Sequence, residues 1–218
     1  MIRGAFLKEY AVIFDLDGTL WDISDTATFT ANTVAAKHGL PEISKATVKK
    51  AFGQRREGSA VLYFPHLPLK DSLPLIDEII SQTAKDVLSK GGKLYADLID
   101  TLKVLNGDYD LYIISNSPQA EYVKSFIDFS GTADLFKGFY SVGELRLTKG
   151  ESIAKVVSDN NYTQAVYVGD TELDFAAANE GGVTFVFAGY GFGEVKGAKY
   201  RIDSICELPQ ILMGVFGQ

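Results

Sequence analysis

The segment Ala11–Asp22, which reads AVIFDLDGTLWD, decides the fold. It opens with an apolar run, Ala11–Phe14, that is typical of a buried strand in a parallel sheet. Asp15 and Asp17 follow directly, and Gly18 lets the backbone turn sharply, so that both carboxylates can face one point. One carboxylate could then act as a nucleophile and the other as a proton donor and acceptor. Two acids in a loop are also common as a solvated turn, so the rest of the chain has to decide between these interpretations.

Three more apolar runs predict further buried strands: Leu111–Ile114, Ala165–Val168 and Val183–Ala188. Apolar residues with helical spacing lie between the runs, for example Leu98, Leu102 and Leu105. Strands that alternate with helices predict an α/β fold, with a doubly wound (Rossmann-like) parallel sheet as its core.

A segment of about 70 residues after the first strand interrupts this alternation, because it contains helix signals and no convincing strand. Ser44 is expected to cap one helix, and Asp71 or Ser72 to open another. A further helix is expected to carry a single stripe of side chains: Phe29, Thr33 and Ala36. The predicted domains are therefore an α/β catalytic core and an inserted α-helical cap, at residues 1–21 with 93–218 and at residues 22–92.

Polar residues follow three of the predicted strands at the point where each strand ends: Asp15, Ser115 and Asp170. In open α/β sheets, ligands bind outside the carboxyl ends of the strands. Any one of these residues alone would favour a helix N-cap. Together they predict a site at one edge of the sheet.

The order of these residues resembles the haloacid dehalogenase superfamily, whose phosphatase members carry the Asp-x-Asp-Gly-Thr signature. Ser115, in ISNS, is similar to the second motif of that family, Lys149 to the third, and Gly169–Asp174, GDTELD, to the fourth. Residues 186–193, VFAGYGFG, resemble the loop after the last core strand in phosphoglycolate-phosphatase-like members. Gly150 departs from the pattern, because many relatives have proline there, and this leaves open how rigidly the lysine is held.

The resemblance implies ester hydrolysis in two steps through an aspartyl-phosphate. Asp15 would be the nucleophile and Asp17 the general acid and base, and a carboxylate at Asp17 favours phosphate esters over dehalogenation. The implied Mg²⁺ site consists of Asp15, the backbone carbonyl of Asp17, Asp170 and Asp174. For Asp174, an ordinary acid in the first turn of a helix is nearly as well supported.

Lys149 and Ser115 are the residues expected to bind the phosphoryl group during catalysis. Thr19 and Asn116 are further expected substrate contacts, although Asn116 fits a turn-shaping role equally well. Arg56 lies in a loop that resembles the specificity loop of β-phosphoglucomutase-like caps, where an arginine meets an anionic group. Two adjacent arginines beside a glutamate slightly favour an exposed salt-bridged face instead.

The composition excludes several classes of partner. The chain has 218 residues and a net charge of −7, from 21 basic and 28 acidic residues, which argues against nucleic-acid binding. No run approaches the roughly 18 apolar residues that a membrane span needs, so no membrane association is expected. A single cysteine, Cys206, permits no internal disulfide and fits a reducing cytoplasm.

We therefore expect a cytoplasmic, Mg²⁺-dependent phosphatase that hydrolyses a small phosphorylated metabolite, as a monomer or homodimer. A β-phosphoglucomutase-like phosphosugar mutase would use the same residues, with Arg56 at a second phosphate site. A non-catalytic phosphate-binding protein of the same fold is the remaining alternative.

Overall fold

The computed structural model describes residues 8–117 and 119–217, and within them six strands form a parallel sheet in the order β5-β4-β1-β6-β7-β8. The strands in this order are Phe136–Ser141, Asp110–Ser115, Tyr10–Phe14, Gln164–Gly169, Thr184–Ala188 and Tyr200–Ile202. The predicted doubly wound α/β core is confirmed, with β1 in the middle between β4 and β6. This order places the ends of β1, β4 and β6 next to one another, and with them Asp15, Ser115 and Asp170.

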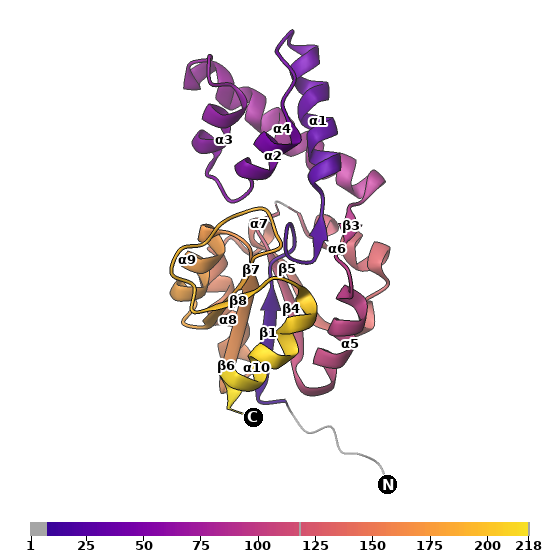
Figure 1. Cartoon of the computed structure of the whole chain (residues 1–218), viewed down its shortest axis with the longest axis vertical. Coiled ribbons are helices and arrows are strands. Elements are labelled where there is room, and N and C mark those ends of the chain that lie inside the picture. Colours follow the sequence, from indigo (N-terminus) through magenta and orange to yellow (C-terminus); the bar gives the residue numbers. More distant parts are fainter. Residues whose placement is uncertain (1–7, 118, 218) are drawn as a thin grey trace.

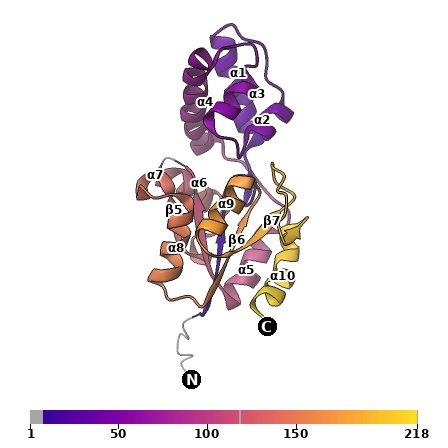
Figure 2. The same cartoon turned by 90° about the vertical axis from the view of Figure 1, so that its left-hand side faces the viewer.

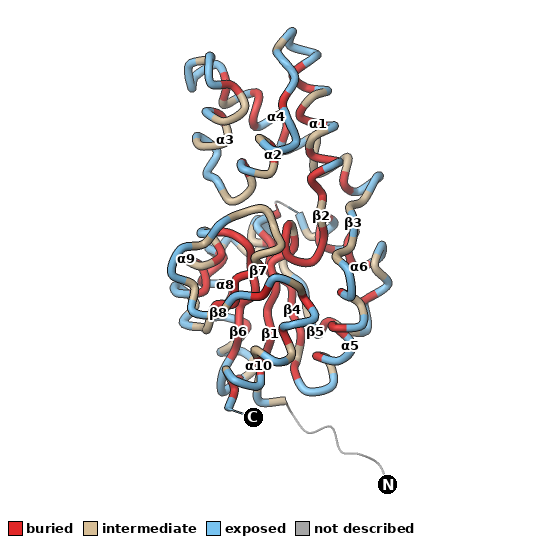
Figure 3. Tube along the Cα trace, in the orientation of Figure 1, coloured by how far each residue is buried: buried red, intermediate tan, exposed pale blue. Residues whose placement is uncertain are grey.

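Helices cover both faces of the sheet, as Figures 1 and 2 show. The helices and short turns of the core are α5 Leu98–Asp108, α6 Ala120–Ser130, α7 Val142–Leu145, α8 Lys149–Asp159, α9 Glu172–Glu180, α10 Leu208–Phe216 and the 3₁₀ turns Ala133–Leu135 and Ile205–Glu207. Val12 and Phe14 of β1 pack into the cluster with α5, α6 and α10, while Ala11 and Ile13 pack into the cluster with α8 and α9. Figure 3 shows β1, β4, β6 and β7 as almost continuously buried segments, which explains why these four strands read as apolar runs.

The sequence patterns did not identify the two outer strands, β5 and β8. β5 reads FKGFYS and alternates between buried and exposed positions, and β8 has only three residues. Both lie at the edges of the sheet, where one side is uncovered and an unbroken apolar run is not required.

The segment between β2 and β3, residues 23–92, is here called the helical insert. β2 (Trp21–Asp22) and β3 (Lys93–Leu94) pair antiparallel and form its neck. Its helices are α1 Ser24–Lys37, α2 Lys45–Ala51, α3 Arg56–Tyr63 and α4 Leu69–Lys90. They enclose a hydrophobic cluster of their own, beyond the edge of the sheet toward which the β1 arrow points (Figure 1).

The predicted helices of the insert are present, with one start that differs. The α1 helix carries Phe29, Thr33 and Ala36 on one stripe, which lies on its exposed side, while Ala27, Ala31, Val34 and Ala35 are buried against its neighbours. The spacing alone did not show which face meets α4, and small residues allow the closer approach. The α4 helix begins at Leu69 and contains Pro74, instead of starting just before this proline. Ser44, in contrast, caps α2 as predicted, because its hydroxyl accepts a hydrogen bond from the amide of Thr47.

No helix in the described ranges, 8–117 and 119–217, combines the length and the apolar character that crossing a membrane requires.

Candidate active site

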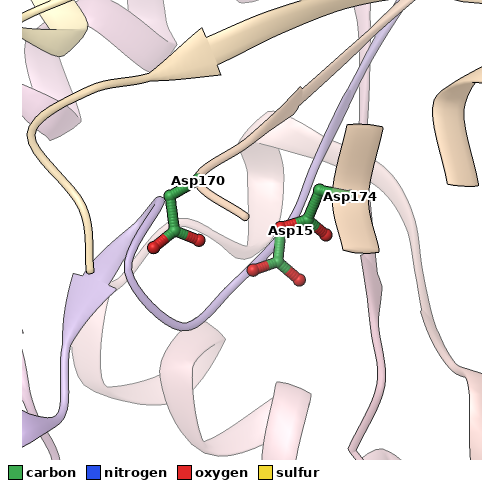
Figure 4. Close-up of side chains that lie close together, drawn as sticks. All are labelled: Asp15, Asp170 and Asp174. Carbon is green, nitrogen blue, oxygen red and sulfur yellow. The ribbon is translucent and has the colours of Figure 1, made fainter. Parts of the chain in front are cut away.

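The carboxyl ends of the central strands converge on one cluster of buried acids (Figure 4). Asp15 follows β1, Asp170 follows β6, and Asp174 lies in the first turn of α9. These residues are 7%, 0% and 2% exposed, and one oxygen from each lies within 4.8 Å of the others. Three carboxylates this close together repel one another unless a positive charge lies among them.

Lys149 supplies part of that charge from the first turn of α8. Its ammonium group donates hydrogen bonds of 2.6 Å to one oxygen of Asp15 and 2.6 Å to one oxygen of Asp174. Thr148 caps this helix, and a reciprocal capping box with Glu151 fixes the turn in which the lysine lies. The lysine is therefore held by local backbone structure, without the proline that many relatives have at position 150.

Gly150 has a packing role of its own. A Cβ atom at this position would lie 2.5 Å from side-chain atoms of Glu180 on α9. Glu180 accepts a hydrogen bond of 2.7 Å from the hydroxyl of Thr148. The glycine thus allows the first turn of α8 to approach the last turn of α9 closely.

The buried acids have perturbed pKa values. Burial, reinforced by the charge of Asp174, raises the pKa of Asp15 to about 7 although Lys149 opposes the shift. Burial, together with the charges of Asp174 and Asp15, raises the pKa of Asp170 well above its usual range. For Lys149, burial lowers the pKa, but attraction to Asp15 and Asp174 outweighs this effect and raises it well above its usual range. Without a metal ion, the site therefore disfavours the charged forms of Asp15 and Asp170.

The residues fit a divalent cation. Among the described residues, nothing donates a hydrogen bond to the buried Oδ1 of Asp170, whereas its Oδ2 accepts one of 2.7 Å from the amide of Phe192. A buried carboxylate oxygen without a partner is costly unless it binds a cation. Both oxygens of Asp174 are occupied, one by Lys149 and the other by Thr171. Asp15 and Asp170 are thus the better placed ligands, and Asp174 orients the lysine.

Asp17 is held differently from the other acids. Its Oδ1 accepts hydrogen bonds of 3.0 Å from the indole of Trp21 and 2.8 Å from the hydroxyl of Tyr122 on α6. Burial raises the pKa of Asp17 to about 6, against the lowering effect of these two donors. A carboxyl group with a pKa near neutrality suits proton transfer. Sequence reasoning missed Tyr122, because it lies 105 residues away and in no recognised motif.

The predicted phosphate-binding residues divide into two groups. Ser115 and Asn116 line a pocket of about 310 Å³ together with Asp15, Asp17 and Lys149. Thr19 does not line this pocket, because its side chain is completely buried. Its backbone carbonyl accepts a hydrogen bond of 2.9 Å from Tyr190, which ties the first motif to the loop at residues 186–193.

The structure does not bring Arg56 to the pocket, contrary to the role predicted for it. Its guanidinium forms an exposed, bidentate ion pair with Asp77 on α4. This agrees with the alternative of a salt-bridged outer face. The residues just before it do line the pocket: Phe52, Gly53 and Gln54.

The loop before Arg56 makes close contact with the core. Gly53 has a left-handed backbone conformation, with φ of +76°, and a Cβ atom there would lie 2.5 Å from the side chain of Thr171. Beside it, the rings of Phe52 and Phe192 lie 4.5 Å apart. Phe192 also donates its amide to Asp170, so one loop of the core supports both the acid cluster and the insert.

Comparison with known proteins agrees with this geometry. The sequence profile of the haloacid dehalogenase-like hydrolases matches residues 12–188. Phosphoglycolate phosphatase of Xanthomonas campestris is 26% identical over 208 residues, which cover 91% of this chain and 92% of that protein. The plasmid-encoded phosphoglycolate phosphatase of Cupriavidus necator is 25% identical over 226 residues, with 93% and 92% covered.

The fold also matches solved structures. A haloacid dehalogenase-like hydrolase from Streptococcus pneumoniae superposes with a TM-score of 0.78 at 24% identity, over 93% of this chain and 97% of that one. The family profile covers both the acid loop after β1 and the fourth motif after β6. The chain therefore belongs to the haloacid dehalogenase-like hydrolases, within their phosphoglycolate-phosphatase-like group, and is a phosphatase.

Proposed function

We propose that this phosphatase uses Mg²⁺ to hydrolyse a small phosphorylated metabolite in two steps, through an aspartyl-phosphate on Asp15. The observation that carries the proposal is the contact between Lys149 and Asp15, which both line the pocket, in one cluster with Asp170, whose Oδ1 has no partner among the described residues. A nucleophile, a fixed cation and a free metal-ligand atom are the parts that transfer of a phosphoryl group to a carboxylate requires.

In the first step, an oxygen of Asp15 forms a bond to phosphorus while the bond from phosphorus to the leaving oxygen breaks. Asp17 donates its proton to that oxygen, so that a neutral alcohol departs. In the second step, Asp17 takes a proton from water as the water oxygen attacks phosphorus, which releases phosphate and restores Asp15. Tyr122 and Trp21 hold the carboxyl group of Asp17 in place through both steps.

Positive charge has to offset the repulsion between Asp15 and the phosphoryl oxygens. Lys149 provides it from one side, and Ser115 and Asn116 are proposed to donate hydrogen bonds to the phosphoryl group. Asp15, Asp170 and the backbone carbonyl of Asp17 are the proposed Mg²⁺ ligands, and Asp174 the residue that orients Lys149. When bound, the ion would supply a further positive charge against the phosphoryl oxygens.

The helical insert is proposed to act as a cap domain, with boundaries at residues 22 and 92. The support is that one pocket is lined both by strand-end residues of the core and by α3 and α4 of the insert. Such a cap keeps bulk water away from the acyl-phosphate. The cytoplasmic location and the monomeric or dimeric state stay predictions.

The test is phosphate release from p-nitrophenyl phosphate by purified protein, with and without Mg²⁺. We expect turnover that requires the metal, and Asp15→Asn is expected to abolish it while the thermal unfolding midpoint is retained. Lack of turnover by the intact protein with Mg²⁺ would contradict the proposal. The relatives' name makes phosphoglycolate one candidate for a wider substrate panel.

A phosphosugar mutase would need a second phosphate-binding group in the insert. Arg56 was the residue predicted for this task, and its guanidinium is instead paired with Asp77 at the surface. We therefore expect a hexose 1-phosphate to yield free phosphate, if it reacts, and no isomerised ester.

A further inference from the structure

The pocket has a second wall, on the side of the helical insert, that the reaction itself does not use. Apart from Gln54, its larger side chains are aliphatic or aromatic: Ile23, Phe52, Tyr63, Ile76, Ile79 and Ile80. With the phosphoryl group at Asp15, the leaving group has to extend toward this wall, because the insert lies beyond the carboxyl end of the sheet (Figure 1). The chemistry of the wall therefore selects the leaving group.

Ile80 is the informative member of this wall. Ile76 and Ile79 are buried in the cluster of the insert, where ordinary packing explains them. Ile80 lines the pocket and is 50% exposed, so an apolar surface is left open toward the site. A substrate that covers Ile80 would gain from removing it from water.

The charges around the pocket also favour an uncharged leaving group. Among the described residues that line it, Lys149 is the only cation, and it already contacts Asp15 and Asp174. Asp17 adds a third carboxylate to the lining. A second anionic group on the substrate would thus lie against apolar side chains of the insert, where none of the described lining residues carries a positive charge, and this is unfavourable.

We propose that the substrate is a phosphate monoester of an uncharged alcohol with an apolar flank, about the size of one ring or a short alkyl chain. This inference rests on the phosphatase function proposed above and specifies its substrate class. The volume of about 310 Å³ limits the size. Gln54, Ser59 and Thr83 also line the pocket and can hydrogen-bond a hydroxyl group of such an alcohol. Esters with a second negative charge, phosphoglycolate included, are poor substrates on this basis.

The first experiment compares phenyl phosphate with 4-carboxyphenyl phosphate, two esters of nearly the same shape that differ by one carboxylate. We expect kcat/KM for phenyl phosphate to be higher by at least about tenfold, because the carboxylate has to be buried without a partner. Phosphoglycolate is expected to be poorer than phenyl phosphate as well. Equal or faster hydrolysis of the charged ester would overturn the inference and leave the phosphatase function intact. If neither ester nor p-nitrophenyl phosphate releases phosphate, the proposed function fails and the inference with it.

The second experiment places a cation on the apolar wall. Ile80→Lys is expected to raise kcat/KM for 4-carboxyphenyl phosphate relative to phenyl phosphate by about tenfold or more. Leu88→Lys is the matched control, because Leu88 lies on the same helix, is 45% exposed and does not line the pocket. It adds the same charge and should leave the ratio unchanged. An equal change of the ratio in both variants, or no change in Ile80→Lys, would contradict the inference.

Discussion

The two walls of the pocket differ in composition and in origin. The wall from the core contains the acids and the lysine, which project from the ends of buried strands and from capped first turns of helices. The wall from the helical insert is mainly apolar, and most of its side chains come from helices, with Phe52 and Gln54 from the loop before Arg56.

This difference separates two tasks. The charged wall is rigid, because each group in it has partners from at least one other element, as Lys149 has in Asp15 and Asp174. It suits a reaction that is common to many esters. The apolar wall contributes mainly steric fit and apolar contact area, so it suits discrimination between leaving groups. Changes in the charged wall should reduce the rate for every substrate, and changes in the apolar wall should reorder the substrates.

Lys149→Met is expected to cause the largest loss among the substitutions that follow. The buried acids lose their cation and the phosphoryl group loses a donor, so kcat should fall by at least about a hundredfold for all esters. Lys155→Met on the same helix is the control, because that lysine pairs with Asp159 at the surface and does not line the pocket. A loss confined to one ester would contradict the division between the two walls.

Tyr122→Phe is expected to lower kcat by roughly tenfold, since Asp17 loses one of its two donors. The Tyr122 hydrogen bond lowers the pKa of Asp17, so its removal should move the corresponding limb of the pH–rate profile to higher pH. Tyr162→Phe removes a comparable hydrogen bond to Asp110 at the other end of the sheet and should not move this limb. Similar profiles for the two variants would show that Tyr122 acts only through stability.

The stability of the metal-free protein should depend on pH through the same charged wall. Burial raises the pKa of Asp15 to about 7 and that of Asp17 to about 6, from an ordinary value of 3.8 in the unfolded chain. The folded state then holds protons that the unfolded state has lost, so the unfolding midpoint should fall as pH rises from about 4 to about 7, and then level off.

Mg²⁺ should counteract this loss, with a larger stabilisation at pH 8 than at pH 5, where protons compete for the acids. Surface acids with lowered pKa values, such as Asp25, change the stability only at pH values below this range, because they take up protons at lower pH. Thermal scans with and without Mg²⁺ measure both effects. A midpoint that rises between pH 4 and pH 7 without metal would contradict the raised pKa values of Asp15 and Asp17.

Arg56→Ala is expected to have the smallest effect, because its partner Asp77 is also exposed and neither residue lines the pocket. The kcat/KM values for phenyl phosphate and 4-carboxyphenyl phosphate should change by less than about twofold. A selective loss for the charged ester would show that Arg56 reaches the substrate, and would weaken the contrast between the walls.

Sequence reasoning found the parts of the site that local rules determine. An apolar run followed by acids predicts a strand that ends in a loop, and the carboxyl ends of neighbouring parallel strands meet at one edge. Asp15, Asp17, Ser115 and Asp170 can be named in this way, whereas Lys149 follows only from the family resemblance, and the structure places all five around one pocket or directly beside it. The edge strands β5 and β8 gave no such signal, because an uncovered edge does not require an apolar run.

Other features depend on contacts between distant segments, which spacing does not predict. The same α1 sequence could have buried either of two faces, and packing against α4 selected the one with small residues. Tyr122 reaches Asp17 across 105 residues, and Arg56 turns to Asp77 on the neighbouring helix.

The sequence by itself determined the doubly wound core and the acids that meet at one edge of it, since motifs at strand ends are local and parallel strands bring them together. Lys149 followed only from the family resemblance. The tertiary structure alone decided how Asp17 is held and which side chains form the wall opposite the nucleophile. These choices depend on how the helical insert packs against the core through Gly53 and Phe52. That contact joins segments that lie far apart in the sequence, so local patterns do not predict it.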